Sequence, residues 1–188
     1  MIADPVPLDL ERLLAALSRH AVQYVITGSV AALAHGVELS PGDLDIAPAL
    51  TPQNLAALAS FLAELGAKPK HVPTWQQGPS REACERWLAQ PATETNLDHR
   101  FVTRYGELDV VPRLAGTYDQ LISRAVHMTA FELPILVAHL DDLISLCERW
   151  GRGTDQARLP ALNALRSGLD GSSAGRDVGA RLGRRAGS

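Results

Sequence analysis

Three groups of residues in this chain have the types and spacing that phosphate chemistry requires. They are the pair Gly28-Ser29, the pair Asp43 and Asp45, and the single residue Asp109. Residues two apart in a β-strand face the same side, so Asp43 and Asp45 would present both carboxylates together. Carboxylates gathered in this way repel one another, and a hard divalent cation such as magnesium relieves that repulsion. The pattern therefore predicts a magnesium site suited to phosphoryl-type transfer.

The Gly-Ser pair would supply the phosphate-binding half of such a site. Gly28 would let the backbone approach a phosphate closely, Ser29 would offer its hydroxyl, and a predicted helix over residues 30–35 would present its N-terminal N–H groups. Plainer alternatives are a simple turn, a solvent-facing aspartate pair, and a surface position for Asp109 near a turn. Glu107 could add a carboxylate on the same strand face, although a charge near the turn is preferred. The order and spacing of all three groups favour the chemical interpretation.

Apolar periodicity, caps and turn residues predict the elements that position these groups. In the first part of the chain they are a helix over residues 8–19 that Asp9 can cap, a strand over 22–27, the short helix stopped by Gly36, a strand over 43–47, and a helix beginning at Thr51-Pro52. The aspartate pair thus lies on the second strand, with the intervening apolar residues facing the core.

The rest of the chain is expected to contain a β-hairpin and further helices. Residues 68–78 indicate a loop or edge strand, and Ser80 could cap a helix that runs to residue 88. Further elements follow: a hairpin over 96–112 turning near Tyr105-Gly106, a short helix over 118–125, a strand over 131–137, and helices over 140–150 and 155–165. Because a tight hairpin is antiparallel, these elements predict an α+β (mixed α/β) fold with a mixed sheet flanked by helices.

The expected organisation is one core with a helical extension and a tail. Residues 1–137 would form the core, 138–167 a C-terminal helical part packed on it, and 168–188 a disordered basic tail. The tail holds four arginines and two aspartates (+2), which leaves −5 for the rest of a chain whose net charge is −3. A segment rich in Gly, Ser and Arg lacks the apolar surface that would offset its ordering entropy.

Composition is that of a soluble globular protein. Hydrophobic residues make up 46% and charged residues 21% of the chain, and no run approaches the roughly 18 apolar residues of a membrane span. The first ten residues include no basic residue, which argues against a signal peptide and for a cytoplasmic location. Cys84 and Cys147 match no metal-ligand spacing and are expected to be reduced thiols.

The three groups occur in the order found in one enzyme superfamily. Thr27-Gly28-Ser29, a gap of thirteen residues, Asp43-Leu44-Asp45-Ile46 and a later Leu108-Asp109-Val110 resemble the motifs of polymerase-β-like nucleotidyltransferases. The stretch DLDIAPALTPQNLAALASFLAELGA is similar to small bacterial proteins that include AbiEii/MenT-type toxins and minimal or antibiotic-modifying enzymes. The resemblance covers residues 10–165. It implies a polymerase-β-like core in which Asp43 and Asp45 ligate both metals. Asp109 would ligate the catalytic metal near the acceptor hydroxyl, as a candidate to accept its proton.

One position departs from that family's pattern. Such proteins often carry a lysine within a late helix, followed by a Gly-Arg and an aspartate. Here the lysine position is Cys147, while the later motif is kept over residues 151–155. The charge of a triphosphate would then be met by Arg149, Arg152 or a lysine elsewhere, or the late helix is purely structural.

The activity that the resemblance implies is magnesium-dependent transfer of a nucleoside monophosphate from a nucleoside triphosphate, with manganese as an alternative ion. The expected acceptor is the 3′ end of tRNA, modified by the toxin of a toxin-antitoxin pair, so tRNA and an antitoxin protein are expected partners. An antibiotic- or protein-modifying enzyme, a degenerate nucleotide-binding regulatory module and a phosphodiester hydrolase are alternatives.

Contact with RNA would have to be local, because the body of the chain is acidic. On one strand, Arg100 and Arg104 would point the same way at even spacing, which suits tracking of a single-stranded end. The other basic candidates are Arg149, Arg152 and the tail. Solvated surface arginines are the alternative.

Overall fold

The chain folds around one mixed β-sheet in a computed structural model that describes residues 6–70, 99–151, 153–168 and 176–185. The predicted helix over residues 80–88 lies outside those ranges. In sheet order, the described strands are β3 (Lys68–Pro69), β4 (His99–Thr103), β5 (Gly106–Val110), β2 (Asp43–Pro48), β1 (Tyr24–Thr27), β7 (Leu133–Val137) and β6 (Val126–Ala130). Parallel and antiparallel neighbours both occur, so the predicted α+β fold with a mixed sheet is confirmed.

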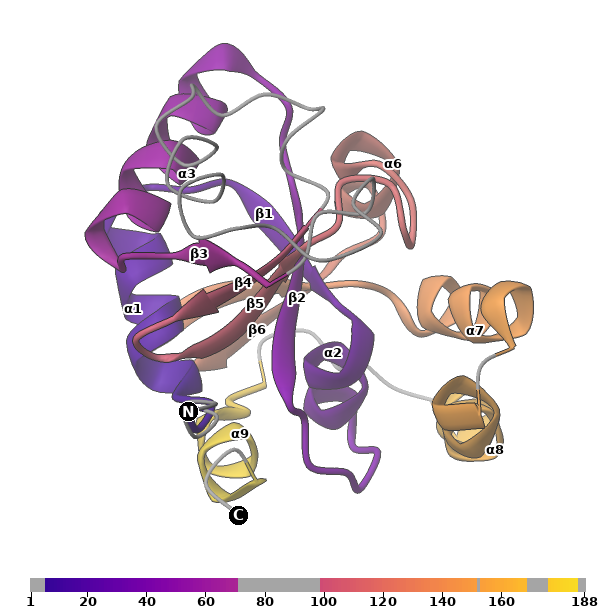
Figure 1. Ribbon diagram of the computed structural model, residues 1–188. Coiled ribbons are helices and arrows are strands. Elements are labelled where there is room, and N and C mark those ends of the chain that lie inside the picture. The colour runs from indigo at the N-terminus through magenta and orange to yellow at the C-terminus, as the bar shows by residue number, and fades with distance from the viewer. Residues whose placement is uncertain (1–5, 71–98, 152, 169–175, 186–188) are drawn as a thin grey trace.

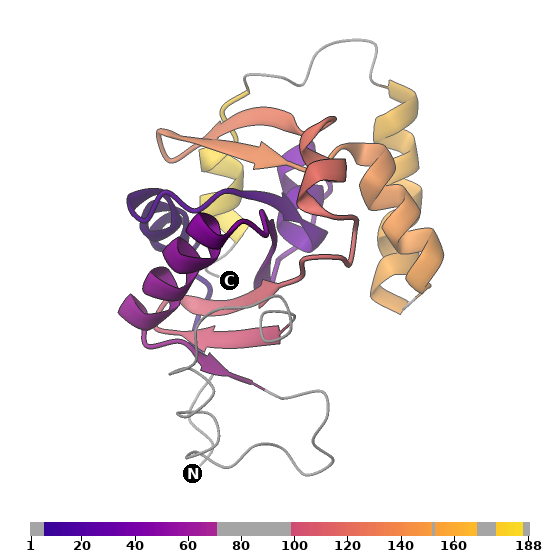
Figure 2. The ribbon, with the colours of Figure 1, turned by 90° about the horizontal axis from the view of Figure 1, so that it is seen from above.

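Helices pack around the sheet and extend from it. In chain order, the described ones are α1 (Leu10–Arg19), α2 (Gly28–His35), α3 (Pro52–Glu64), α6 (Tyr118–Ile122), α7 (Leu140–Trp150), α8 (Gly153–Gly168) and α9 (Gly179–Arg185). Figures 1 and 2 show α1 and α3 on one side of the molecule and α7 and α8 on the other, where α7 packs against α2 and α8. Within the described ranges, none of these helices combines the length and the apolar character that crossing a membrane requires.

Helices α1 and α3 begin where the sequence predicts. The Asp9 carboxylate caps α1 by accepting a hydrogen bond from Arg12 N at 3.0 Å. The Thr51 hydroxyl caps α3 by accepting from Asn54 N at 3.3 Å, and Pro52 stands in the first turn, where its missing N–H is not needed. The core-facing side of α1 includes Ala16 and four leucines, each at most 1% exposed: Leu10, Leu13, Leu14 and Leu17. Burial of each leucine contributes roughly 1.5–3 kcal/mol, so burial of apolar surface is the main force that holds α1 in place.

The centre of the sheet brings together the strands that carry the predicted motifs. β1 pairs antiparallel with β2, with Thr27 opposite Asp45. β2 pairs in parallel with β5, with Asp45 opposite Asp109. β4 and β5 form the predicted antiparallel hairpin, whose two-residue turn is Arg104-Tyr105. The motif residues therefore lie on three adjacent strands.

The sequence predicts only one strand of the hairpin formed by β6 and β7. β7 matches the expected strand over residues 131–137, whereas β6 is not among the expected elements. The strands are joined by Phe131 and Glu132, whose φ angles are 52° and 63°. Two-residue hairpin turns of this kind are usually made by Asn and Gly, which adopt positive φ easily. Because neither occurs here, the turn carries no sequence signal.

The prediction of a disordered tail over residues 168–188 is wrong for 176–185. This segment adds to the sheet and then forms α9, with Val178 N donating to Thr129 O of β6 at 2.7 Å. Val178 and Leu182 are 3% and 0% exposed. Two apolar side chains four residues apart thus order a segment that composition alone assigns to disorder.

Candidate active site

The three predicted aspartates lie on one face of two neighbouring strands. The parallel register of β2 and β5 places Asp43 opposite Glu107 and Asp45 opposite Asp109. The intervening residues face the opposite side and are 0% exposed: Leu44, Ile46 and Leu108. Strand alternation thus gathers four carboxylates, the three predicted ones and that of Glu107.

A single arginine from β4 enters this acidic group. Arg100 stands opposite Asp109 in the hairpin register, and its Nε donates to Asp109 Oδ1 at 2.8 Å. Its Nη2 donates to Asp109 Oδ2 at 3.0 Å and lies 3.1 Å from Asp43 Oδ2. Hydrogen bonding to Asp109 raises the pKa of Arg100, so the guanidinium stays charged. The sequence marks Arg100 only as a candidate RNA contact; the signal that could have placed it here is the hairpin register.

Gly28 and Ser29 form the start of α2, directly against Asp45. The helix begins two residues before its predicted start. Gly28 has a φ of +63°, and a Cβ atom on it would lie 1.9 Å from Asp45 Oδ2. The Ser29 backbone N–H donates a hydrogen bond to the Asp45 carboxylate. The Ser29 side chain is buried, and its Oγ has no hydrogen-bond partner among the described residues, so it is an unsatisfied donor that a phosphate oxygen at this helix N-terminus would satisfy.

Burial and mutual repulsion disfavour the ionised forms of two of the aspartates. Burial raises the pKa of Asp45 to about 8, and the charges of Asp43 and Asp109 add to that effect. Burial also raises the pKa of Asp43, with Asp109 raising it further and Arg100 opposing the shift. The site thus gathers more negative charge than its own arginine neutralises, which favours an added cation.

We expect the stability of the metal-free protein to fall between about pH 4 and about pH 8. In this window Asp45 loses its proton in the unfolded chain, where its pKa is near 3.8, but keeps it in the folded chain, where its pKa is about 8. The folded state then binds more protons, so the free energy of unfolding decreases as pH rises. Asp45→Asn removes this loss and should be more stable than wild type at pH 8 by up to about 6 kcal/mol, because each pKa unit corresponds to about 1.4 kcal/mol. This is roughly 12–24 °C in Tm.

Thermal unfolding in EDTA at pH 5 and pH 8, followed by circular dichroism, measures this effect. Asp119→Asn, on the exposed surface of α6, is the matched control and should change Tm little at either pH. If Asp45→Asn melted below wild type at pH 8, the ionised Asp45 would be a stabilising residue and the expected repulsion would be absent.

The C-terminal helices bring Arg158 toward the acidic face. Burial raises the pKa of both Asp43 and Asp45, and the charge of Arg158 opposes that rise. Half-buried on α8, it lines a cavity of about 530 Å³ between α8 and residues 36–39. No motif in the sequence marks this arginine, because its position depends on how α8 packs.

The late-helix residues predicted to bind nucleotide are placed differently. Arg149 is exposed in the last turn of α7, and in the described part of the chain no hydrogen bond or ion pair joins it to the aspartates. Arg152 lies outside the described residues. Cys147, at the family's lysine position, is 5% exposed within the hydrophobic core. A lysine there would have to bury its charge, so the cysteine suits the packing of α7.

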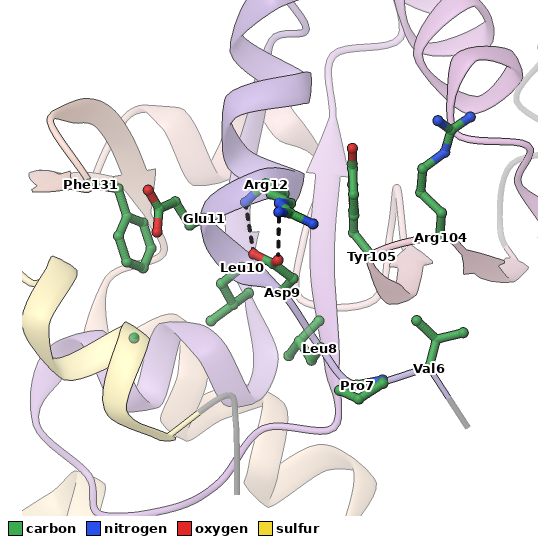
Figure 3. Close-up of a pocket in the computed structure, with 11 residues that line it drawn as sticks. Val6, Pro7, Leu8, Asp9, Leu10, Glu11, Arg12, Arg104, Tyr105 and Phe131 are labelled. Carbon is green, nitrogen blue, oxygen red and sulfur yellow. Dashed lines mark hydrogen bonds and ion pairs between the residues drawn. The ribbon is translucent and has the colours of Figure 1, made fainter. Parts of the chain in front are cut away.

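The expectation that Arg100 and Arg104 point the same way along one strand is wrong. β4 ends at Thr103, and Arg104 belongs to the turn, where it donates a hydrogen bond to Glu64 O. Together with Tyr105 it lines a cavity of about 450 Å³ beside the start of α1 (Figure 3). Strand alternation stops at the turn, so the two arginines serve different parts of the hairpin.

The carboxylate oxygens of the three aspartates suit magnesium as ligands, and in this structure those of Asp43 and Asp109 face Arg100. Asp43, Asp45 and Asp109 offer hard oxygen ligands on one sheet face. The unpaired hydroxyl of Ser29 and the tight approach of α2 lie beside them. Within the described ranges, no three acidic, imidazole or thiolate side chains form a ready coordination sphere. Arg100 contacts oxygens of Asp109 and Asp43, so a metal bound there would lie beside its guanidinium group.

Comparison with known proteins gives no family for the chain: no family model matches it, and no curated protein does. The chemistry of the site follows from its own geometry. It combines oxygen ligands for a hard cation with a helix N-terminus that carries an unpaired hydroxyl. It also holds Asp109, whose side chain is 14% exposed and can accept a proton.

Proposed function

We propose that this protein is a magnesium-dependent nucleotidyltransferase, which moves a nucleoside monophosphate from a nucleoside triphosphate to an acceptor hydroxyl. The observation that carries the proposal is the shared sheet face of Asp43, Asp45 and Asp109, with the start of α2 pressed against Asp45. The resemblance to polymerase-β-like nucleotidyltransferases supports it, because that family uses the same residue types in the same order.

Each carboxylate has its own task in this reaction. Asp43, Asp45 and Asp109 would hold magnesium, which when bound neutralises charge on the triphosphate. The acceptor oxygen attacks the α-phosphorus: a new P–O bond forms, the bond to the β-phosphate oxygen breaks, and pyrophosphate leaves. Asp109 accepts the proton of the acceptor hydroxyl.

The phosphate chain would lie between the start of α2 and Arg158. Ser29 Oγ and Thr27 Oγ1 are buried hydroxyls without hydrogen-bond partners among the described residues, and both can donate to phosphate oxygens. The helix N-terminus adds N–H groups and the positive end of its dipole. Arg158, whose charge already acts on Asp43 and Asp45, would replace the family's late-helix lysine.

Ser29→Ala is expected to raise the KM for the nucleoside triphosphate about tenfold, since a hydrogen bond to a charged group contributes about 1.5–3 kcal/mol. Its Tm should stay within about 2 °C of wild type, because no described hydrogen bond is lost. Ser60→Ala is the control, since that hydroxyl donates only to Ala56 O on the exposed side of α3. An unchanged KM with a Tm lowered by about 5 °C or more would make Ser29 a structural residue.

The proposed acceptor is the 3′ end of tRNA, with an antitoxin protein as the partner that restrains the enzyme. This step rests on the resemblance to toxin nucleotidyltransferases. The structure of the hairpin supports a tRNA acceptor less than the sequence does, because Arg100 contacts carboxylates and Arg104 lies in the turn. Contact with RNA would then depend on the other basic candidates, which are Arg149, Arg152 and the arginines of the tail.

Incubation with magnesium, each α-labelled nucleoside triphosphate and one class of acceptor at a time identifies the acceptor. Total RNA, total protein, and a mixture of aminoglycosides and lincosamides are the three arms. Label on tRNA is the expected result. Label only on drugs or on protein would overturn the tRNA acceptor and indicate a modifying enzyme instead. Nucleotide binding without product would indicate a regulatory module, and loss of triphosphate without labelled acceptor a hydrolase.

A further inference from the structure

Arg100 engages the oxygens that a metal ion would need. It donates to both oxygens of Asp109, at 2.8 and 3.0 Å, and lies 3.1 Å from Asp43 Oδ2. A two-pronged pair of this kind is the geometry in which arginine binds a carboxylate most strongly. The Asp109 and Asp43 side chains are 14% and 21% exposed, so water screens these pairs less than it screens a surface ion pair.

A divalent cation and Arg100 compete for these oxygens. Magnesium binds carboxylate oxygens at about 2.0–2.1 Å, a distance that leaves no room for a guanidinium nitrogen on the same lone pair. A metal held by Asp43 and Asp109 would also lie within a few ångströms of the guanidinium charge, and like charges that close repel each other strongly. Occupancy by one cation therefore opposes occupancy by the other.

Glu107 offers Arg100 a second carboxylate on the same sheet face. Its Oε2 lies 3.7 Å from Arg100 Nη1, and it stands two residues before Asp109 on β5. Its other oxygen, Oε1, lies 2.5 Å from Lys70 Nζ, next to β3. The lysine thus fixes Glu107 with one oxygen turned toward the arginine. A short movement of the Arg100 side chain along β5, from Asp109 toward Glu107, would exchange one carboxylate for the other.

We propose that Arg100 is an internal competitor of the divalent cation. It neutralises Asp43 and Asp109 when metal is absent, and it turns to Glu107 when metal binds. The inference rests on the proposed function, because it takes these aspartates as the metal ligands. Arg100 is in this account a positioning residue: it keeps the acidic face assembled without metal, and it lowers the affinity of that face for metal.

Titration of the full chain with Mn²⁺ alone measures this competition without any turnover, since the resonance signal of free Mn²⁺ falls as the ion binds. Arg100→Met is expected to bind Mn²⁺ at least about fivefold more tightly than wild type, the lower end of ordinary coupling between two ligands. Arg104→Met is the matched control, because it removes an arginine of the same hairpin that donates to a backbone carbonyl. Its affinity should stay within about twofold of wild type.

A second pair of variants separates competition from a simple change of charge. Glu107→Gln removes the alternative partner of Arg100, so it should weaken Mn²⁺ binding in wild type and weaken it less in the Arg100→Met background. The double-mutant cycle isolates that difference. If Arg100→Met does not fold, Arg100→Lys takes its place: it keeps the charge but loses the two-pronged geometry, and it should bind Mn²⁺ at least about twofold more tightly than wild type.

The outcomes distinguish this inference from the proposed function. In one outcome, Asp43→Asn abolishes Mn²⁺ binding, whereas Arg100→Met leaves the affinity for Mn²⁺ at the wild-type value or lowers it. This outcome would overturn the competition but would still support the metal site. Absence of Mn²⁺ binding in both wild type and Arg100→Met would overturn both. Tighter binding by Arg100→Met, with Arg104→Met unchanged, is the expected result.

Discussion

Replacing Asp109 by asparagine is expected to lower the rate of nucleotide transfer by about 10³–10⁴-fold, the upper part of the range that a positioned general base contributes. The amide keeps the shape of the side chain but cannot serve as the base that takes the acceptor's proton. The sheet should persist, because Arg100 retains Asp43 and Glu107 as partners. Initial rates with an α-labelled triphosphate, together with circular dichroism of the same sample, measure both parts of this prediction.

The control for Asp109 is an aspartate outside the acidic face. Asp119→Asn, on the exposed side of α6, should keep at least about half of the wild-type rate, since surface substitutions away from the site have small effects. Asp109→Asn that kept a third of the wild-type rate and an unchanged Tm would remove Asp109 from the reaction.

Gly28→Ala should lower transfer by at least about 100-fold, the loss that a misplacement of about 1 Å at an active site can cause. The added Cβ would lie 1.9 Å from Asp45 Oδ2, whereas ordinary van der Waals contacts begin at 3.4 Å. Asp45 or the start of α2 must therefore shift by more than an ångström. Because Asp45 is a proposed metal ligand, this shift should also weaken Mn²⁺ binding in the same titration.

Gly66→Ala is a close control for Gly28→Ala. Gly66 has a φ of +59°, near the +63° of Gly28, but a Cβ on it would meet nothing within 4 Å. It therefore reports the strain of the left-handed conformation alone, roughly 1–2 kcal/mol. Both variants should lose similar stability from strain, while only Gly28→Ala should lose transfer. Equal rates for the two would mean that the closeness of Gly28 and Asp45 has no part in the reaction.

Features that depend on neighbouring residues in the chain could be predicted from the sequence. The alternation in residues 43–46 predicts that Asp43 and Asp45 share a face, and the burial of Leu44 and Ile46 confirms it. The caps Asp9 and Thr51 mark the starts of two helices for the same reason, since a cap acts within three residues.

Features that depend on strand register and helix packing could not be predicted. Arg100 meets Asp109 because the hairpin turns at Arg104-Tyr105, and a turn one residue longer would put the two side chains on opposite faces. Arg158 reaches the acidic face only through the way α8 packs, which no local pattern encodes. The sequence does not predict α9 and β6 for a related reason. The segment before α9 is ordered mainly by its hydrogen bonds to β6, and β6 is ordered mainly by its pairing with β7.

Metal-dependent transfer of a nucleoside monophosphate at the aspartate face can be tested with one nucleoside triphosphate prepared in two forms. One form carries label on the α-phosphate and the other on the γ-phosphate, and the product that takes up each label is identified. With magnesium and the class of acceptor that takes up label, the α-phosphate label should enter the product and the γ-phosphate label should leave in pyrophosphate. EDTA and the Asp45→Asn substitution should each abolish both the labelling of the product and the release of labelled pyrophosphate. Transfer of γ-phosphate label to an acceptor, or release of inorganic phosphate in place of pyrophosphate, would exclude nucleotidyl transfer at this site.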